Sequence, residues 1–221
     1  MIDFAAARRM MVDGQVRTAD VTDPRLIAAM LALPRERFFP EDKISLAYLD
    51  LDFPVSEDGL PVRRLLKPMV LGKLIQIAEV TDSDHVLDVG CASGYSTALL
   101  SRLTGSVVGL EEDPILARQA TAALATLDAA NTKIVMGPLS RGCPEQAPYD
   151  LIVLQGSTEV VPTALLKQLK NGGRLTCVLG RGPGGKAMLY RMIEGDLSGR
   201  PMFDAAAALL PGFSKPPEFV F

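Results

Sequence analysis

One segment narrows the choice of fold sharply: the run VLDVGCASGY at residues 86–95. An apolar stretch of strand length passes through an acidic residue into a glycine, and a helical pattern begins after a second glycine. Gly90 and Gly94 allow a tight turn and a close approach of the backbone to a ligand. Open α/β sheets bind ligands at such strand-to-helix turns. The segment therefore predicts an α/β sheet with a binding site at this turn.

Short apolar runs alternate with helical patterns after residue 81, which predicts a parallel sheet. The predicted strands are His85–Val89, Ser106–Glu111, Lys133–Met136, Leu151–Leu154 and Arg174–Leu179. The predicted helices between them cover about residues 95–103, 114–127 and 162–169. Continuous apolar strands joined through helices are typical of a sheet covered on both faces, with right-handed crossovers. We expect a doubly wound, mostly parallel α/β fold.

The N-terminal part has a different rhythm. Asp3 and Asp23 are suited to cap helices, and Pro24 suits the first helical position. Helices are expected at about residues 4–13 and 24–33, with another from Pro68. The prolines and glycine between residues 38 and 67 favour irregular chain over a surface, as in a lid.

The C-terminal part departs from the alternation as well. Lys186–Ile193 and Met202–Leu210 are separated by a turn-rich stretch without a crossover helix, which predicts a terminal antiparallel pair. We expect residues 1–80 to form a helical lid region packed on a core of residues 81–221, in one compact unit.

Two carboxylates lie at the ends of predicted strands, at the binding edge. Asp88 can receive the ammonium group of a methionine moiety, and Glu111, 23 residues later, can accept both hydroxyls of a ribose. The spacing D-x-G-x-x-x-G differs from the G-x-G-x-x-G of dinucleotide-binding turns, which disfavours nicotinamide cofactors. The structural alternative is that Asp88 caps the helix, Glu111 faces solvent and the glycines serve packing alone.

At these residues the chain resembles the class I methyltransferases, over about residues 84–180. The resemblance implies a seven-stranded sheet, S-adenosylmethionine as cofactor, S-adenosylhomocysteine as product, and no metal. The cofactor-binding positions that it implies are Asp88, Val89, Gly90, Cys91, Ala92, Gly94, Tyr95, Glu111, Pro138, Leu139 and Gln155.

Within that class the chain resembles the protein-L-isoaspartate O-methyltransferases. The stretches VTDPRL at 21–26 and LPRERF at 33–38 are similar to the family's helical lead-in. YDLIV at 149–153, followed by PTAL at 162–165 and GGRL at 172–175, is similar to its fourth strand, helix and fifth strand. The resemblance implies methyl transfer to the carboxylate of isoaspartyl residues in damaged proteins, so the expected partner is a protein or peptide substrate.

Some family positions are altered. The family carries a T-[IV]-S-Q-P segment before the helix that Pro68 opens, whereas this chain has RLLKP, with Leu66 at the serine position. An acceptor pocket must then use the backbone or the cations Arg63, Arg64 and Lys67, with Gln155 also at the binding edge.

Two further alterations concern the cofactor. Pro138 stands where the family has an acidic residue suited to the adenine amino group. Ala92 replaces a frequent glycine, which costs little if its backbone angles are ordinary.

No catalytic residue is assigned, because an isoaspartyl carboxylate is already ionised near pH 7 and needs no general base. Two alternatives remain open. The chain can be a noncatalytic cofactor-binding or regulatory homologue, or it can methylate a small molecule or RNA, because the same core serves many reactions.

Composition restricts the remaining classes. The net charge of −3 supplies no broad positive field, which disfavours nucleic acid as a partner. Three widely spaced cysteines and a single histidine are too few soft ligands for a metal cluster. Apolar stretches are too short to span a membrane, and we expect a cytoplasmic protein. The sequence does not decide the oligomeric state, with a monomer favoured.

Overall fold

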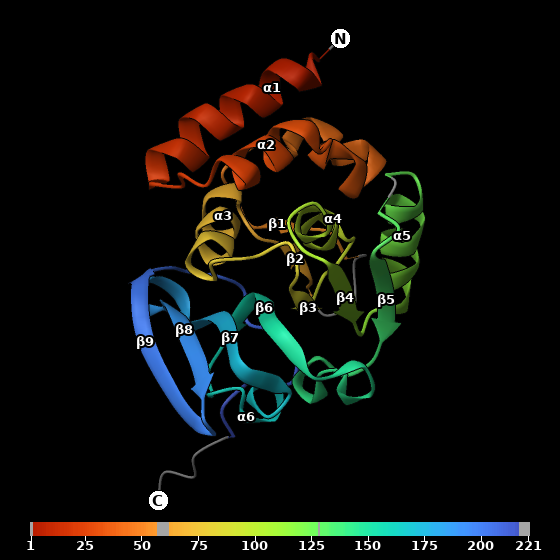
Figure 1. Cartoon of the computed structure of the whole chain (residues 1–221). Coiled ribbons are helices and arrows are strands. Elements are labelled where there is room, and N and C mark those ends of the chain that lie inside the picture. The colour runs from red at the N-terminus through yellow and green to blue at the C-terminus, as the bar shows by residue number, and fades with distance from the viewer. Residues whose placement is uncertain (1, 57–61, 128, 217–221) are drawn as a thin grey trace, which may run out of the picture.

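A seven-stranded sheet forms the centre of the computed structural model, which describes residues 2–56, 62–127 and 129–216 (Figure 1). The strands lie in the order β5-β4-β3-β6-β7-β8-β9. Their bounds are β3 His85–Val89, β4 Ser106–Glu111, β5 Thr132–Met136, β6 Tyr149–Thr158, β7 Leu169–Leu179, β8 Lys186–Ile193 and β9 Asp196–Asp204. The first five strands in this order are parallel, and β8 and β9 are antiparallel. The predicted doubly wound sheet with a terminal antiparallel pair is confirmed.

The helices between the parallel strands are α4 Tyr95–Ser101, α5 Pro114–Ala125 and the short α6 Thr163–Leu166. Asp113 caps α5 by accepting hydrogen bonds from the amides of Ile115 and Leu116. The predicted helix at 162–169 is too long, because β7 already begins at Leu169.

In Figure 1 the N-terminal helices lie on the side of the sheet that α4 covers, with the red and orange ones outermost. They are α1 Phe4–Met11, α2 Pro24–Ala32 and α3 Pro68–Ile77. Asp3 and Asp23 cap the first two by accepting from Ala6 N and Arg25 N, as predicted. After α1 the chain continues through a π-helical turn, Val12–Val16, and a 3₁₀ turn, Arg17–Ala19.

The described residues of the segment predicted to be irregular form only short elements. They are the 3₁₀ helices Arg35–Phe38 and Glu41–Leu46 and the paired strands β1 Phe53–Pro54 and β2 Arg64–Leu65. One hydrophobic cluster joins this N-terminal part to the sheet and its helices, with Met11, Leu26 and Met30 packed in it alongside Leu99 and Val153. The division at residue 80 stays a prediction.

The predicted bounds of the last strand are wrong. β9 covers Asp196–Asp204 rather than residues 202–210, because the hairpin turn needs only Glu194 and Gly195, both with positive φ (54° and 91°). Residues after β9 run back beside the end of β6 instead. Ser157 N donates to Ala208 O at 2.7 Å, and Leu210 N donates to Ser157 O at 2.9 Å.

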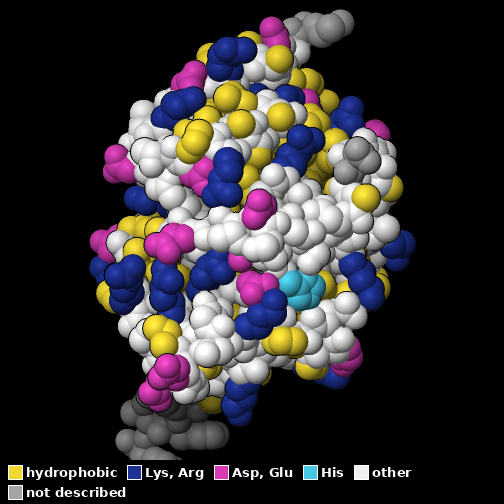
Figure 2. Space-filling model, viewed as in Figure 1, with side chains coloured by type: hydrophobic (Ala, Val, Ile, Leu, Met, Phe, Trp, Pro, Cys, Tyr) yellow, Lys and Arg dark blue, Asp and Glu magenta, His cyan; other side chains and the backbone are white. Residues whose placement is uncertain are grey.

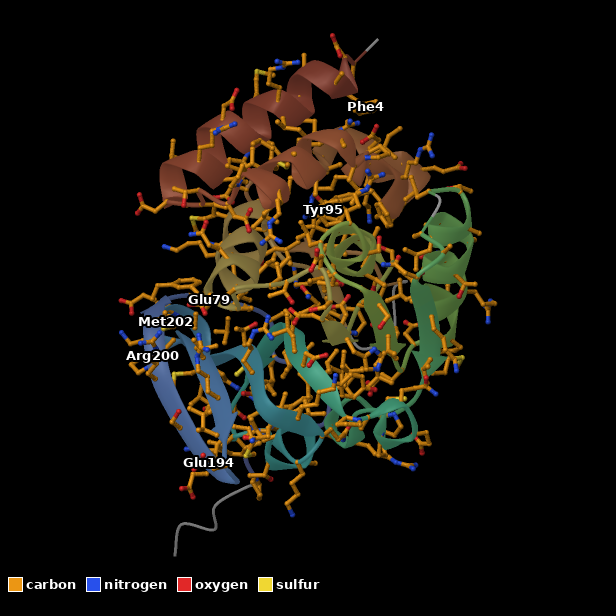
Figure 3. The ribbon with its side chains drawn as sticks, viewed as in Figure 1. Phe4, Glu79, Tyr95, Glu194, Arg200 and Met202 are labelled. Carbon is orange, nitrogen blue, oxygen red and sulfur yellow. The ribbon has the colours of Figure 1, made fainter. Side chains whose placement is uncertain are left out.

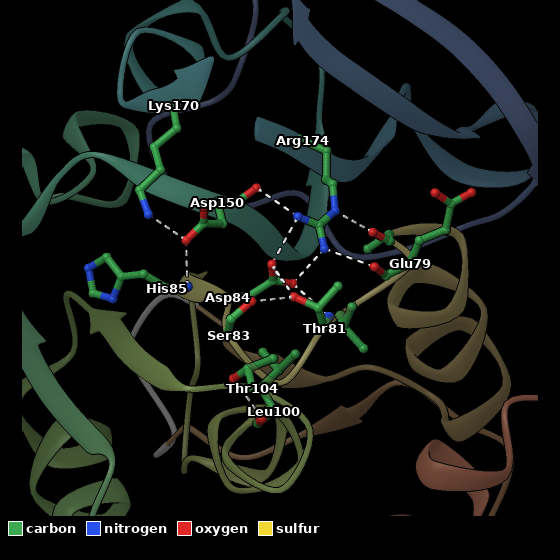
Figure 4. A network of polar contacts seen from close by, with 12 residues as sticks. Glu79, Thr81, Ser83, Asp84, His85, Leu100, Thr104, Asp150, Lys170 and Arg174 are labelled. Atoms are coloured by element: carbon green, nitrogen blue, oxygen red, sulfur yellow. Dashed lines mark hydrogen bonds and ion pairs between the residues drawn. The ribbon is translucent and has the colours of Figure 1, made fainter. Parts of the chain in front are cut away.

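A buried polar network fixes α3 to the amino end of the sheet (Figure 4). Arg174 of β7 forms an ion pair with Asp84 and donates to the carbonyls of Ala78 and Glu79 just after α3. Asp84 also accepts from the amide and hydroxyl of Thr81. The network therefore holds together the helix end, β7 and the chain that leads into β3.

Asp150 lies beside this network. Its carboxylate accepts from Lys170 Nζ and from the His85 amide. Burial favours a higher pKa for Asp150, but these donors outweigh it and lower the pKa. The imidazole of His85 contacts Ser106 and the carbonyl of Gln146, at the opposite end of β3 from the glycine turn.

Surface charges are interspersed on the face shown in Figure 2, with hydrophobic side chains gathered over the N-terminal helices. Among the described residues, no helix is long and apolar enough to cross a membrane. The same part of the chain contains no group of three or more His, Cys, Asp or Glu side chains placed to hold a metal ion.

Candidate cofactor site

The turn between β3 and α4 has the backbone conformation that its glycines predict. Gly90 and Gly94 have φ values of 78° and 97°, a region that favours glycine. A Cβ at position 94 would lie 3.0 Å from Ala120 Cβ, so this glycine also permits close packing on α5. Ala92 has a φ of 51°, and its backbone angles are therefore not ordinary for a residue with a side chain.

Asp88 is fully buried at the end of β3, and three side chains donate to its carboxylate. Ser96 Oγ and Thr97 Oγ1 donate to Oδ2, and Gln155 Nε2 donates to Oδ1, each at 2.7 Å. Burial raises the pKa of Asp88 to about 6, although the three hydrogen bonds act in the opposite direction and the charge of Glu111 adds to the rise. Asp88 and Gln155 are brought together as the prediction of a shared binding edge requires.

Sequence reasoning missed Ser96 and Thr97. They lie in the first turn of α4, directly after the second glycine and Tyr95, and their hydroxyls reach back to Asp88. Their position two and three residues beyond Gly94 is the sequence signal that could have identified them.

Glu111 is buried at the end of β4 and does not face solvent. Its Oε2 accepts from Ala92 N at 2.7 Å, and its Oε1 accepts from the amides of Glu112 and Asp113 at 3.0 and 3.2 Å. The guanidinium of Arg63 also contacts both oxygens, with Nε 3.1 Å from Oε1 and Nη2 3.0 Å from Oε2. The structure thus gives Arg63, a candidate for the acceptor pocket, a different partner.

Arg63 and Leu210 cover the glycine turn. A Cβ at position 90 would lie 2.5 Å from Arg63 Nη2, 3.1 Å from Leu210 Cδ2 and 3.4 Å from Leu139 Cδ1. Leu210 also lies against Gly156, where a Cβ would be 2.7 Å from Leu210 Cδ2. No local pattern reveals these contacts, because each joins residues far apart in the sequence.

The side chains of this edge fit S-adenosylmethionine by type, but little space is open over the glycine turn itself. Asp88, Glu111 and the two glycines provide the carboxylates and the open backbone that the cofactor needs. The cavity lined by Gly90, Cys91 and Gln155 has a volume of about 10 Å³. Sites for small molecules measure about 300–1,000 Å³. Arg63 and Leu210 fill the space over Gly90 in this conformation.

The other predicted cofactor positions lie around the same turn. Val89, Cys91 and Leu139 are buried. Burial raises the pKa of the Cys91 thiol well above its ordinary value, so this cysteine stays protonated. Pro138 precedes a short 3₁₀ turn that begins at Leu139.

Tyr95 is buried between α4 and the N-terminal helices (Figure 3). The Arg35 guanidinium carbon lies 4.5 Å from the centroid of its ring, and Phe38 makes an edge contact with a centroid distance of 5.4 Å. Tyr95 thus connects the glycine turn to the N-terminal part of the chain.

The candidate acceptor residues lie next to the cavity, although one is not part of its lining. Arg64, Leu66 and Gln155 line it together with Gly90. Arg64 is half-buried and donates to the carbonyl of Asp52 at 2.9 Å. Lys67 is half-buried outside this lining, and its amide donates to the Asp52 carboxylate.

Comparison with known proteins shows the family of this chain. The family model described as protein-L-isoaspartate(D-aspartate) O-methyltransferase matches residues 7–198. Protein-L-isoaspartate O-methyltransferase 1 of Rhodopseudomonas palustris (strain HaA2) is 37% identical over 177 residues, which cover 80% of this chain and 71% of that protein. The protein-L-isoaspartate O-methyltransferase of Roseiflexus sp. (strain RS-1) is 33% identical over 195 residues, 88% of this chain and 87% of that protein.

Two solved structures share the fold. A protein-L-isoaspartate O-methyltransferase superposes with a TM-score of 0.82 at 24% identity, covering 93% of this chain and 66% of that one, just under two thirds of its length. A putative protein-L-isoaspartate O-methyltransferase from Plasmodium falciparum, in complex with S-adenosylhomocysteine, gives a TM-score of 0.76 at 18% identity and covers 95% and 99% of the two chains. They confirm the predicted methyltransferase fold. The family model and the relatives confirm the predicted class, whose methyl donor is S-adenosylmethionine, and the chain belongs to the protein-L-isoaspartate O-methyltransferase family.

Proposed function

We propose that this chain methylates the carboxylate of isoaspartyl residues in proteins or peptides, with S-adenosylmethionine as methyl donor. The observation that carries the proposal is the family match over residues 7–198, which includes the whole polar set at the carboxyl edge of the sheet. Asp88, Glu111 and Gln155 all belong to that set and are buried, with Gln155 bonded to Asp88 and Glu111 at the end of the neighbouring strand. The damaged protein is the proposed partner, and the cytoplasm is the proposed location.

The residues at the edge support a reaction that depends on positioning. The acceptor carboxylate has an ordinary pKa near 4 and is ionised at pH 7, so no side chain has to remove a proton from it. The carboxylates of Asp88 and Glu111 are both engaged by donors and are suited to binding rather than to proton transfer. What the chain supplies is orientation of the two substrates and exclusion of water.

Arg64 is the proposed contact for the acceptor carboxylate. Arg64 and Arg35 both line the small cavity, but the Arg35 guanidinium is buried and donates to the carbonyls of Ala47 and Leu66. A guanidinium can bind a carboxylate through two parallel hydrogen bonds. Leu66, at the family's serine position, cannot donate a hydrogen bond and supplies an apolar wall. We propose that Lys67 adds positive charge nearby.

The test is transfer of labelled methyl from saturating S-adenosylmethionine to an isoaspartyl peptide, beside the same peptide with a normal aspartyl residue. We expect base-labile label on the isoaspartyl peptide alone. Glu111→Ala should abolish it, whereas the matched variant Glu112→Ala, one residue along the same loop, should retain it. Equal labelling of both peptides, or none when the cofactor binds measurably, would refute the proposed acceptor.

A noncatalytic role is the second candidate, and the covered glycine turn favours it. Arg63 and Leu210 occupy the cofactor edge in the described conformation. Measurable binding of S-adenosylhomocysteine without transfer of label to any peptide would support this second role.

A further inference from the structure

Arg63 occupies the place on Glu111 that a ribose is expected to take. Its Nε and Nη2 donate to the two carboxylate oxygens at 3.1 and 3.0 Å, and the pair is buried, with side-chain exposures of 3% and 0%. A guanidinium matches a carboxylate with two parallel hydrogen bonds. The two hydroxyls of a ribose would donate to the same two oxygens. Arg63 and the ribose are therefore mutually exclusive partners of Glu111.

The same side chain blocks the backbone that a cofactor must approach. Arg63 Nη2 lies so close to Gly90 that a Cβ there would be 2.5 Å away, and Leu210 fills the space between Gly90 and Gly156. Because Gly90 and Gly156 have no side chains, other groups can approach their backbone closely. In this chain the side chains of Arg63 and Leu210 occupy that space. Arg63 therefore fills the space beside Glu111, and Leu210 fills the apolar space beside the two glycines.

Glu111 and Arg63 are held very differently. Three backbone amides donate to Glu111, so its carboxylate stays hydrogen-bonded when Arg63 departs. Arg63 precedes the two-residue strand β2, and its backbone is held by Val55 N at 2.9 Å and Ser56 Oγ at 3.0 Å. A ligand that displaces the Arg63 side chain therefore leaves the Glu111 carboxylate in place.

We propose that Arg63 is a self-docked occupant of the ribose site and a determinant of cofactor affinity, so that S-adenosylmethionine binds only when Arg63 leaves Glu111. This inference rests on the proposed use of that cofactor, but it does not depend on the acceptor. A ligand that requires a minor conformation binds with its affinity reduced by the fraction of molecules in that conformation. The Arg63–Glu111 pair should therefore weaken cofactor binding in the intact chain.

The test is calorimetric titration of the full chain with S-adenosylhomocysteine. We expect Arg63→Ala to bind about 10- to 1,000-fold more tightly than the unaltered chain, the range for a binding-competent state populated at about 0.1–10%. Arg191→Ala is the matched control, because it removes an arginine from a surface ion pair with Glu79 and should change binding by less than about twofold. Equal or weaker binding by Arg63→Ala, including no binding by either protein, overturns the proposal.

A second variant covers the case in which Arg63→Ala does not fold, because it leaves a buried carboxylate without its cation. Arg63→Lys keeps the positive charge but lacks the planar fork, and we expect about threefold tighter binding or more. If this folded variant binds no more tightly than the unaltered chain, the proposal fails. Methyl transfer plays no part in either measurement, so failure of the proposed reaction is distinguishable from failure of this inference.

Discussion

Replacing Asp88 by Asn should make the folded chain more stable at neutral pH. Asp88 is buried, and burial raises its pKa from 3.8 to about 6. Between these two values the folded state holds a proton that the unfolded state has lost, so the contribution of Asp88 to stability falls as pH rises from about 4 to about 6. The difference in pKa corresponds to about 3 kcal/mol. Asn keeps the shape and can still accept from the hydroxyls of Ser96 and Thr97.

The assay is urea unfolding of both proteins from pH 4 to pH 7.5. The free energy of unfolding of Asp88→Asn, minus that of the unaltered chain, should increase by roughly 2–3 kcal/mol over this range. Any constant offset from altered hydrogen bonds does not affect this slope. Asp42→Asn, a change at an exposed carboxylate, serves as control. A difference for Asp88→Asn that stays flat with pH would show that this carboxyl ionises as it does in the unfolded chain, and would refute the reasoning.

Three further changes test other parts of the structure. Arg174→Met leaves Asp84 buried without its cation and should cost about 3–5 kcal/mol in urea unfolding; a loss no larger than that of a surface pair would contradict the assigned role. Ala92→Gly removes left-handed backbone strain of about 1–2 kcal/mol but adds conformational entropy to the unfolded chain. The free energy of unfolding should rise by about 0.5–1 kcal/mol in the same assay, and a decrease would contradict the assigned strain. Arg64→Ala should raise KM for an isoaspartyl peptide about 10-fold with little change in kcat, because one charged contact to the substrate is lost. Steady-state kinetics measure this, and an unchanged KM would exclude the contact.

The sheet could be predicted because its signals are local. The apolar run at His85–Val89 and the periodic pattern of α5 each fall within a few residues, and they fixed the element type and order. The last strand was misplaced, since the two-residue turn at Glu194 and Gly195 depends on backbone angles that composition does not encode. The predicted strand 202–210 extends beyond β9 into residues that pair instead with the end of β6 through Ser157.

The candidate site was predictable only in part, for the same physical reason. Asp88 and Glu111 stand at strand ends, where topology alone places functional groups together. The partner of Glu111 lies 48 residues earlier in the chain, and a buried ion pair of this kind depends on how the chain folds back. The sequence identifies Arg63 as one of several cations near the site, but it does not predict that Arg63 pairs with Glu111.

The arginine of β7 has a consequence for how the chain folds. Arg174 donates to the carbonyls of Ala78 and Glu79 at the end of α3, which lie 96 and 95 residues earlier in the sequence. Contacts of such long range form late, because most of the loop-closure entropy has to be lost before they stabilise anything. The terminus of an early helix is thus completed only when the fifth parallel strand has docked, and this coupling favours a single cooperative folding transition for the helices and the sheet together.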